Sequence, residues 1–152
     1  MATIFDVADF FLANQEPTDF CNIFKLQPLC AYAAALTLTV TNHKLFTDPL
    51  EATSVGPQIA TLANFYKAQG KSPLSTTKTK DEAKKPFSEQ ELYILNCVNG
   101  YYGAFAAHRL IQLARQDFQS EQATIDLSIL QRRFQGDYLV RSIKENFATI
   151  YD

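Results

Sequence analysis

The stretch Phe24-Lys-Leu-Gln-Pro-Leu-Cys-Ala-Tyr-Ala-Ala decides the fold, because it opens the longest apolar segment of the chain. It carries one polar pair, Lys25 and Gln27, and is otherwise almost wholly apolar. From about residue 22 to residue 41 the segment is apolar on nearly every side, which is typical of a helix that other helices surround. We therefore predict a central helix over residues 22–41.

Two features of this segment resist a simple helix. Pro28 has no backbone N–H, so it predicts either a kink or a delayed start of the helix at that residue. The run Thr37-Leu-Thr-Val-Thr alternates at period two with β-branched residues, as a strand does. The length of the segment and its run of alanines favour the helix.

The remaining segments predict a mainly α fold: a compact single domain over residues 1–152, built as a bundle of six to seven helices. Ile4, Val7, Ala8, Phe11 and Leu12 share one helical face. Thr3 with Asp6, and Ser88 with Glu91, are capping signals, and Glu16-Pro17 is expected to close the first helix. Further apolar stripes predict helices over 57–70, 88–100, 104–115, 127–134 and from 139 onward.

At most a minor β-hairpin is expected. Residues 45–52 are the candidates for a short extended pair between two turn-like stretches. Val55-Gly56-Pro57 forms the next turn, and Pro57 suits the first position of a new helix that Gly70 would end.

Residues 71–86 form the only linker-like stretch, rich in Lys, Ser and Thr, with a local net charge of +3. Such a composition cannot support a core, so we expect a mobile loop that is dispensable for folding. A basic docking strand for an acidic partner is the functional interpretation, and a solvated loop is the plainer one.

Composition excludes several classes of function. The net charge of −2 argues against a general affinity for nucleic acid or anionic membranes, so neither is expected as a partner. No apolar run is expected to reach the roughly 18–20 residues that a membrane span needs, and the N-terminus lacks the basic start of a signal peptide. The three cysteines, Cys21, Cys30 and Cys97, lack ligand spacing and indicate free thiols in a cytoplasmic protein.

No catalytic or metal-binding constellation is evident. A thiol or hydroxyl nucleophile needs a base and an orienting group beside it. His43 lies in a polar turn and His108 neighbours Arg109, and neither has a local acidic partner. We therefore expect no enzyme activity, no cofactor and no metal site; a thiol hydrolase is the weakest hypothesis.

Two motifs resemble the Panacea (SocA-like) antitoxin domain, a phage-associated family of toxin–antitoxin systems. Lys25-Leu26-Gln27 with Tyr32-Ala33 resembles its central motif, and Leu50-Glu51-Ala52 with Gly56-Pro57 resembles its turn block. Val7-Ala8 through Leu12 is similar to the opening helix, and Tyr102-Gly103 to its Tyr-Gly junction. Pro28, Cys30, Thr53 and Val55 depart from the family pattern.

The resemblance implies a non-enzymatic domain that binds a cognate toxin and neutralises it directly, or delivers it to a protease. The alternative is a divergent interaction module, a phage accessory factor or secreted effector, without antitoxin activity. Protein interfaces place exposed aromatic and apolar anchors inside a polar rim. The candidate partner-binding residues are Lys25, Gln27, Val55, Gly56, Pro57, Tyr66, Tyr101, Tyr102 and Phe118.

Overall fold

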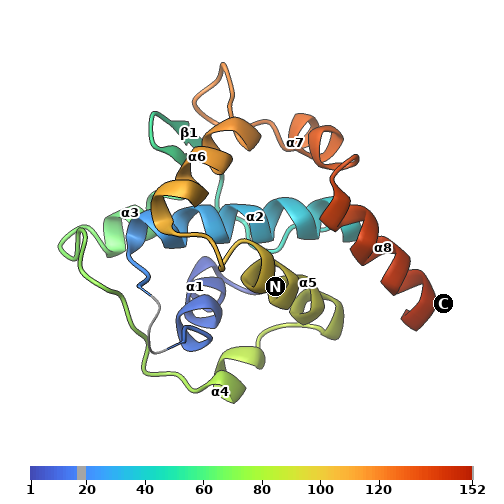
Figure 1. Cartoon of the computed structure of the whole chain (residues 1–152), viewed down its shortest axis with the longest axis horizontal. Helices are drawn as coiled ribbons and strands as arrows, with labels where there is room; N and C mark the ends of the chain where they lie inside the picture. The colour runs from blue at the N-terminus through green and yellow to red at the C-terminus, as the bar shows by residue number, and fades with distance from the viewer. Residues whose placement is uncertain (17–19, 152) are drawn as a thin grey trace.

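The central apolar segment forms one helix, α2 (Ile23–Thr41), around which the other described helices except α4 pack (Figure 1). This computed structural model describes residues 1–16 and 20–151. Seven further helices are described: α1 (Ile4–Ala13), α3 (Ala60–Phe65), α4 (Lys80–Lys84), α5 (Glu89–Tyr101), α6 (Ala107–Asp117), α7 (Leu127–Phe134) and α8 (Tyr138–Tyr151). The strands β1 (Glu51–Thr53) and β2 (Gly56–Gln58) make one antiparallel hairpin. The prediction of a mainly α bundle with a minor hairpin is confirmed, and α4 is the helix beyond the expected seven.

Helix α2 begins well before its proline. The side chain of Asn22 accepts hydrogen bonds from the backbone N–H groups of Phe24 and Lys25, which fixes the start at Ile23. Pro28 lies inside the continuous helix, so the predicted delayed start is wrong. The burial of α2 against its neighbours stabilises a helix that its proline alone would disfavour.

The strand interpretation of the threonine-rich end of α2 is also wrong. The hydroxyls of Thr39 and Thr41 donate hydrogen bonds of 2.7 Å to the carbonyl groups of Ala35 and Thr37, one helical turn earlier. A threonine hydroxyl satisfied in this way can be buried within a helix. Tertiary packing therefore overrides the period-two pattern.

Local signals place several other helix boundaries correctly. The predicted capping boxes at Thr3 and at Ser88 are both present, and α7 covers the predicted range of residues. α1 ends at Ala13, while Pro17, which was expected to close this segment, lies outside the described residues. Helix α5 continues through Gly100, which does not break it.

The hairpin occupies residues 51–58 rather than 45–52. Pro57 pairs with Ala52 inside β2, so its predicted place at the start of a helix is wrong; α3 begins three residues later and ends at Phe65, before Gly70. The outer edge of β1 is covered as well, because Glu51 forms a bridge with Thr124. A proline fits β2 because its missing donor is not needed at that position of a short strand.

Residues 71–86 are not a loop without anchors. The partly buried Leu74 packs against the core, and its backbone N–H donates a 2.8 Å hydrogen bond to the carbonyl of Cys21. Lys78 forms a 3.1 Å ion pair with Asp9 of α1. Thr79 and Glu82 form a capping box for α4, whose Ala83 is buried. The expectation that the segment has no anchors is therefore wrong, since α4 packs on α1; its dispensability for folding stays a prediction.

Ala83→Asp is expected to lower the free energy of unfolding by about 1–3 kcal/mol, because it places a charge in the contact between α4 and α1. If α4 detaches from α1 in this variant, only the contacts of its own segment are lost, and this limits the decrease in the free energy of unfolding. Lys80→Ala, at an exposed position of the same helix, is the control and should be nearly neutral. Urea denaturation of both variants decides the question: equal stabilities would mean that the segment does not pack.

The length and hydropathy of α2 also suffice for a membrane span, contrary to the expectation from sequence. Its best 18-residue window has a mean hydropathy of 1.4, and 78% of that window is buried inside the fold. The central helix of a bundle has this same composition, so α2 is weak evidence for a membrane.

Candidate functional site

Lys25, one of the two motif residues on α2, is a buried cation. Its side chain is 5% exposed, and Nζ donates a 2.9 Å hydrogen bond to the carbonyl of Gly103, just past the end of α5. The last turn of α5 contains no basic residue, so Lys25 supplies the positive charge that a helix C-terminus favours. The residue ties α2 to α5, and the expectation of a surface contact at Lys25 is wrong.

Gln27 is buried in the same way, at 6% exposure. Its Oε1 accepts a 2.8 Å hydrogen bond from the backbone N–H of Ile59, and its Nε2 donates one of 3.1 Å to the carbonyl of the same residue. The amide therefore bonds both backbone groups of Ile59, at the junction between β2 and α3; the Ile59 carbonyl also accepts a 3.1 Å hydrogen bond from the N–H of Ala63. Gln27 fixes the hairpin against α2, with its polar atoms occupied inside the fold.

The Val55-Gly56-Pro57 turn divides into an exposed tip and a buried base. The side chain of Val55 is 54% exposed, whereas Gly56 and Pro57 are buried. Gly56 has φ +108°, a conformation that L side chains rarely adopt, and it lies against the stem of Arg115 on α6. Only the tip of this turn is available to a partner.

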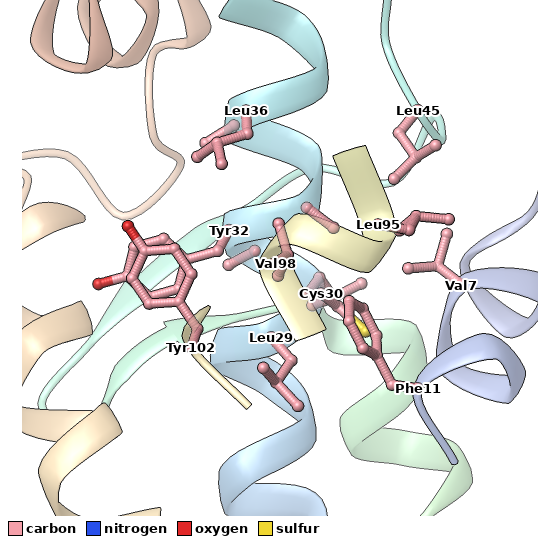
Figure 2. Close-up of a cluster of buried hydrophobic side chains, with 14 of the residues drawn as sticks. Val7, Phe11, Leu29, Cys30, Tyr32, Leu36, Leu45, Leu95, Val98 and Tyr102 are labelled. Atoms are coloured by element: carbon pink, nitrogen blue, oxygen red, sulfur yellow. The ribbon is translucent and has the colours of Figure 1, made fainter. Parts of the chain in front are cut away.

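Two of the aromatic candidates, Tyr102 and Phe118, are buried in the core. The ring of Tyr102 stacks on Tyr32 with a 3.7 Å centroid separation, and Phe118 packs edge-on against the same ring at 5.0 Å. Figure 2 shows the overlapping Tyr32 and Tyr102 rings, with both hydroxyl groups directed to the same side. Tyr102 and Phe118 join the ends of α5 and α6 to α2, so their predicted role as exposed anchors is wrong. Tyr101, by contrast, is exposed.

A polar cluster caps this aromatic stack. The Tyr32 hydroxyl donates a 2.5 Å hydrogen bond to the carboxylate of Asp117. Burial, reinforced by that hydrogen bond, raises the pKa of Tyr32 far above its ordinary value. Burial also raises the pKa of Asp117, against the opposing effect of the Tyr32 hydrogen bond. This hydrogen bond joins α2 to α6, since Tyr32 lies on α2 and Asp117 is the last residue of α6.

The thiols and histidines form no reactive set. Cys30 is buried and Cys97 is half-buried, and burial raises the pKa of both thiols. His43 and His108 are exposed. Within residues 1–16 and 20–151, no three His, Cys, Asp or Glu side chains are grouped closely enough to hold a metal ion.

Four of the nine candidates line one pocket, between α2, the hairpin and α3. This α2–α3 pocket has a volume of about 200 Å³. Gln27, Val55, Pro57 and Tyr66 of the predicted set all line it. Its other lining residues are Ile23, Phe24 and Pro28 of α2, with Gln58, Ala63, Lys67 and Gly70.

Sequence reasoning missed two exposed aromatic residues at this pocket: Phe24 lines it, and Phe65 contacts the lining residue Tyr66. Phe24 is 38% exposed at its edge, and Phe65, which contacts Tyr66 at a 4.9 Å centroid distance, is 65% exposed. Phe65 also packs against Phe5 of α1 at 5.0 Å. The exposure of Phe24 could have been expected from its place in the first turn of the central helix, because neighbouring helices do not cover every side of a helix end.

The geometry of this pocket suits an apolar side chain better than a cofactor. Its volume is below the roughly 300–1,000 Å³ of typical small-molecule sites. Its lining is mainly apolar, with Lys67 as its one charged residue. No protein-family model matches the chain, and comparisons with curated proteins and with solved structures likewise found no match.

Proposed function

We propose that this chain is a protein-binding domain that acts as an antitoxin-like module, holding a partner protein at the α2–α3 pocket. The observation that carries the proposal is an apolar pocket lined by the exposed side chains of Phe24 and Val55, with the exposed Phe65 in contact with the lining residue Tyr66. Solvent-exposed aromatic and aliphatic side chains around a hollow are typical anchors of protein interfaces. Each apolar side chain fully buried by a partner would contribute roughly 1.5–3 kcal/mol.

The contacts between the motifs support the family resemblance from which the antitoxin role is proposed. Lys25 of the central motif binds the carbonyl of Gly103 in the Tyr-Gly junction. Gln27 of the same motif binds Ile59, two residues after Gly56-Pro57. Motifs that are far apart in the sequence thus meet in pairs, as parts of one framework would. In this proposal the framework positions the pocket, and the exposed side chains around it contact the toxin.

The proposed role requires no chemistry from the chain itself. Neutralisation follows when the partner's working surface is buried, or when the complex is delivered to a protease. The domain would work in the cytoplasm, where the toxin acts, and its thiols would remain reduced. If a partner binds at the pocket but is not toxic, the chain is an interaction module without antitoxin activity.

Val55→Asp tests the proposal at the exposed tip of the turn. A charge at this position must lose water when a partner covers the pocket, so we expect the dissociation constant for the partner to rise about tenfold or more. The partner to use is the product of the neighbouring gene, measured by calorimetry and by rescue of growth on co-expression. Folding should be unchanged, since the side chain is largely exposed.

Tyr138→Asp is the matched control, because Tyr138 is an exposed aromatic residue, on α8. An aspartate is favourable in the first turn of a helix, so this variant should fold and bind as the parent does. Equal binding by the parent and both variants would remove the pocket from the interface. Failure of any partner to bind the parent would end the proposal.

A further inference from the structure

A polar groove runs over α6 to the hairpin, on the other side of the turn from the α2–α3 pocket. It consists of two open hollows of about 600 and 320 Å³ that share Arg115 and Gln119. Arg109, Gln112 and Gln116 line the first hollow, and Ser54 of the turn lines the second. No carboxylate lines either hollow, although the chain has 16 acidic residues.

The two arginines of this α6 groove are exposed and have no side-chain hydrogen bond or ion pair within the described part of the chain. The acidic residue of the same helix, Asp117, is engaged by the Tyr32 hydroxyl at 2.5 Å. The stem of Arg115 lies against Gly56, with Cγ 3.7 Å from the place of a Cβ atom there. Two unpaired guanidinium groups therefore stand beside glutamine amides, a set of donors that matches carboxylates.

We propose that the α6 groove binds an acidic segment of the partner protein. This inference rests on the proposed function, because it names the chemistry of that same partner. Val55 lines the pocket, while Ser54 and Gly56 line the groove, so one segment crossing the turn reaches both. Such a segment has an apolar anchor for the pocket, followed by glutamates or aspartates for Arg115 and Arg109.

A protein segment fits this groove better than a nucleic acid does. Binding of single strands uses exposed aromatic rings on which bases stack, and the one aromatic residue lining the groove, Phe118, is buried. The net charge of −2 also opposes a long polyanion, whereas two carboxylates suffice for two arginines.

Three fluorescently labelled probes test the inference on the full chain. The first is a peptide with one leucine followed by alternating glutamate and glycine, the second has glutamine in place of glutamate, and the third is single-stranded oligothymidylate. We expect the acidic peptide to bind most tightly, with an affinity that falls as salt is added. The double variant Arg109→Gln with Arg115→Gln should weaken this binding about five- to tenfold.

Arg141→Gln is the matched control, since Arg141 is exposed on α8, and it should bind the acidic peptide as the parent does. Three results would each overturn the inference: no binding at millimolar peptide, equal binding of the glutamine peptide, or tighter binding of oligothymidylate.

Val55→Asp with the neighbouring gene product separates the two proposals. If the acidic peptide binds at the arginines while Val55→Asp leaves partner binding intact, the pocket assignment fails and the groove assignment stands.

Discussion

Gly103→Ala is expected to be the most damaging small substitution in the chain, with a loss of at least about 3 kcal/mol in the free energy of unfolding. A Cβ atom at Gly103 would lie 2.2 Å from the backbone oxygen of Asn99, a distance that no side-chain adjustment can relieve. The backbone cannot move away freely, because its N–H donates to the carbonyl of Val98 and its carbonyl accepts from Lys25. Urea denaturation followed by circular dichroism measures the loss.

Gly100→Ala is the control, at an exposed position in the last turn of α5. Apart from its chain neighbours and the helix's own backbone, no atom lies within 4 Å of a Cβ at Gly100. Alanine there should stabilise the protein by about 0.5–1 kcal/mol, because glycine is a poor helix former. The same substitution three residues apart thus has opposite expected effects. Similar effects at both sites would mean that the end of α5 differs from the structure described.

The hydrogen bond between Lys25 and Gly103 gives both residues a structural role, although Lys25 was predicted to bind a partner. The Lys25 ammonium group donates to the carbonyl of Gly103, just past the end of α5, where the absence of a side chain leaves this acceptor accessible. These residues are distinctive because they assemble the fold. The surface available to a partner lies instead at the neighbouring Phe24 and Val55.

The elements that sequence predicted well are those with complete local signals. The capping boxes at Thr3 and Ser88 and the amphipathic stripe of α7 each reside within a few consecutive residues. Capping and periodicity act over one or two turns, so no knowledge of the rest of the fold is required. Helices α1, α5 and α7 therefore begin where the sequence indicates.

Elements whose stability comes from distant residues were predicted poorly. Thr79 and Glu82 already contain the capping signal of α4, but the anchor of the segment is the pairing of Lys78 with Asp9, far away in the sequence. Pro57 was assigned to a helix because its fixed φ suits a first turn, yet its pairing with Ala52 places it in a strand. In both cases, contacts with other parts of the chain determine the local structure.

The candidate site shows the same division. Val55, Pro57, Tyr66 and Gln27 do line one pocket, which sequence spacing could not reveal. The polar residues of an apolar segment suggested surface positions, because a buried polar group requires a partner that sequence does not show. The fold supplies those partners from Gly103 and Ile59.

Gln27→Leu should cost about 1–3 kcal/mol of unfolding free energy, the second large effect expected in this chain. The substitution introduces an apolar side chain of similar size but leaves the N–H of Ile59, a fully buried residue, without its partner. The Ile59 carbonyl loses its hydrogen bond from Gln27 but still accepts one from the backbone N–H of Ala63. An unsatisfied buried N–H loses its hydration without replacement, so this group accounts for most of the expected loss. Gln69→Leu, at an exposed glutamine, should stay within about 0.5 kcal/mol of the parent.

Gln27→Glu separates the two hydrogen bonds of the amide. A carboxylate still accepts from the Ile59 N–H, but it cannot donate to the Ile59 carbonyl, against which it places a negative charge. Protonation restores the donor, and the protonated form is favoured in the folded state, so the stability deficit relative to the parent should shrink as the pH falls. Denaturation at neutral and mildly acidic pH measures the deficit of each variant. A Gln27→Leu variant as stable as Gln69→Leu, or a Gln27→Glu deficit that does not change with pH, would show that this amide does not join α2 to the hairpin as described.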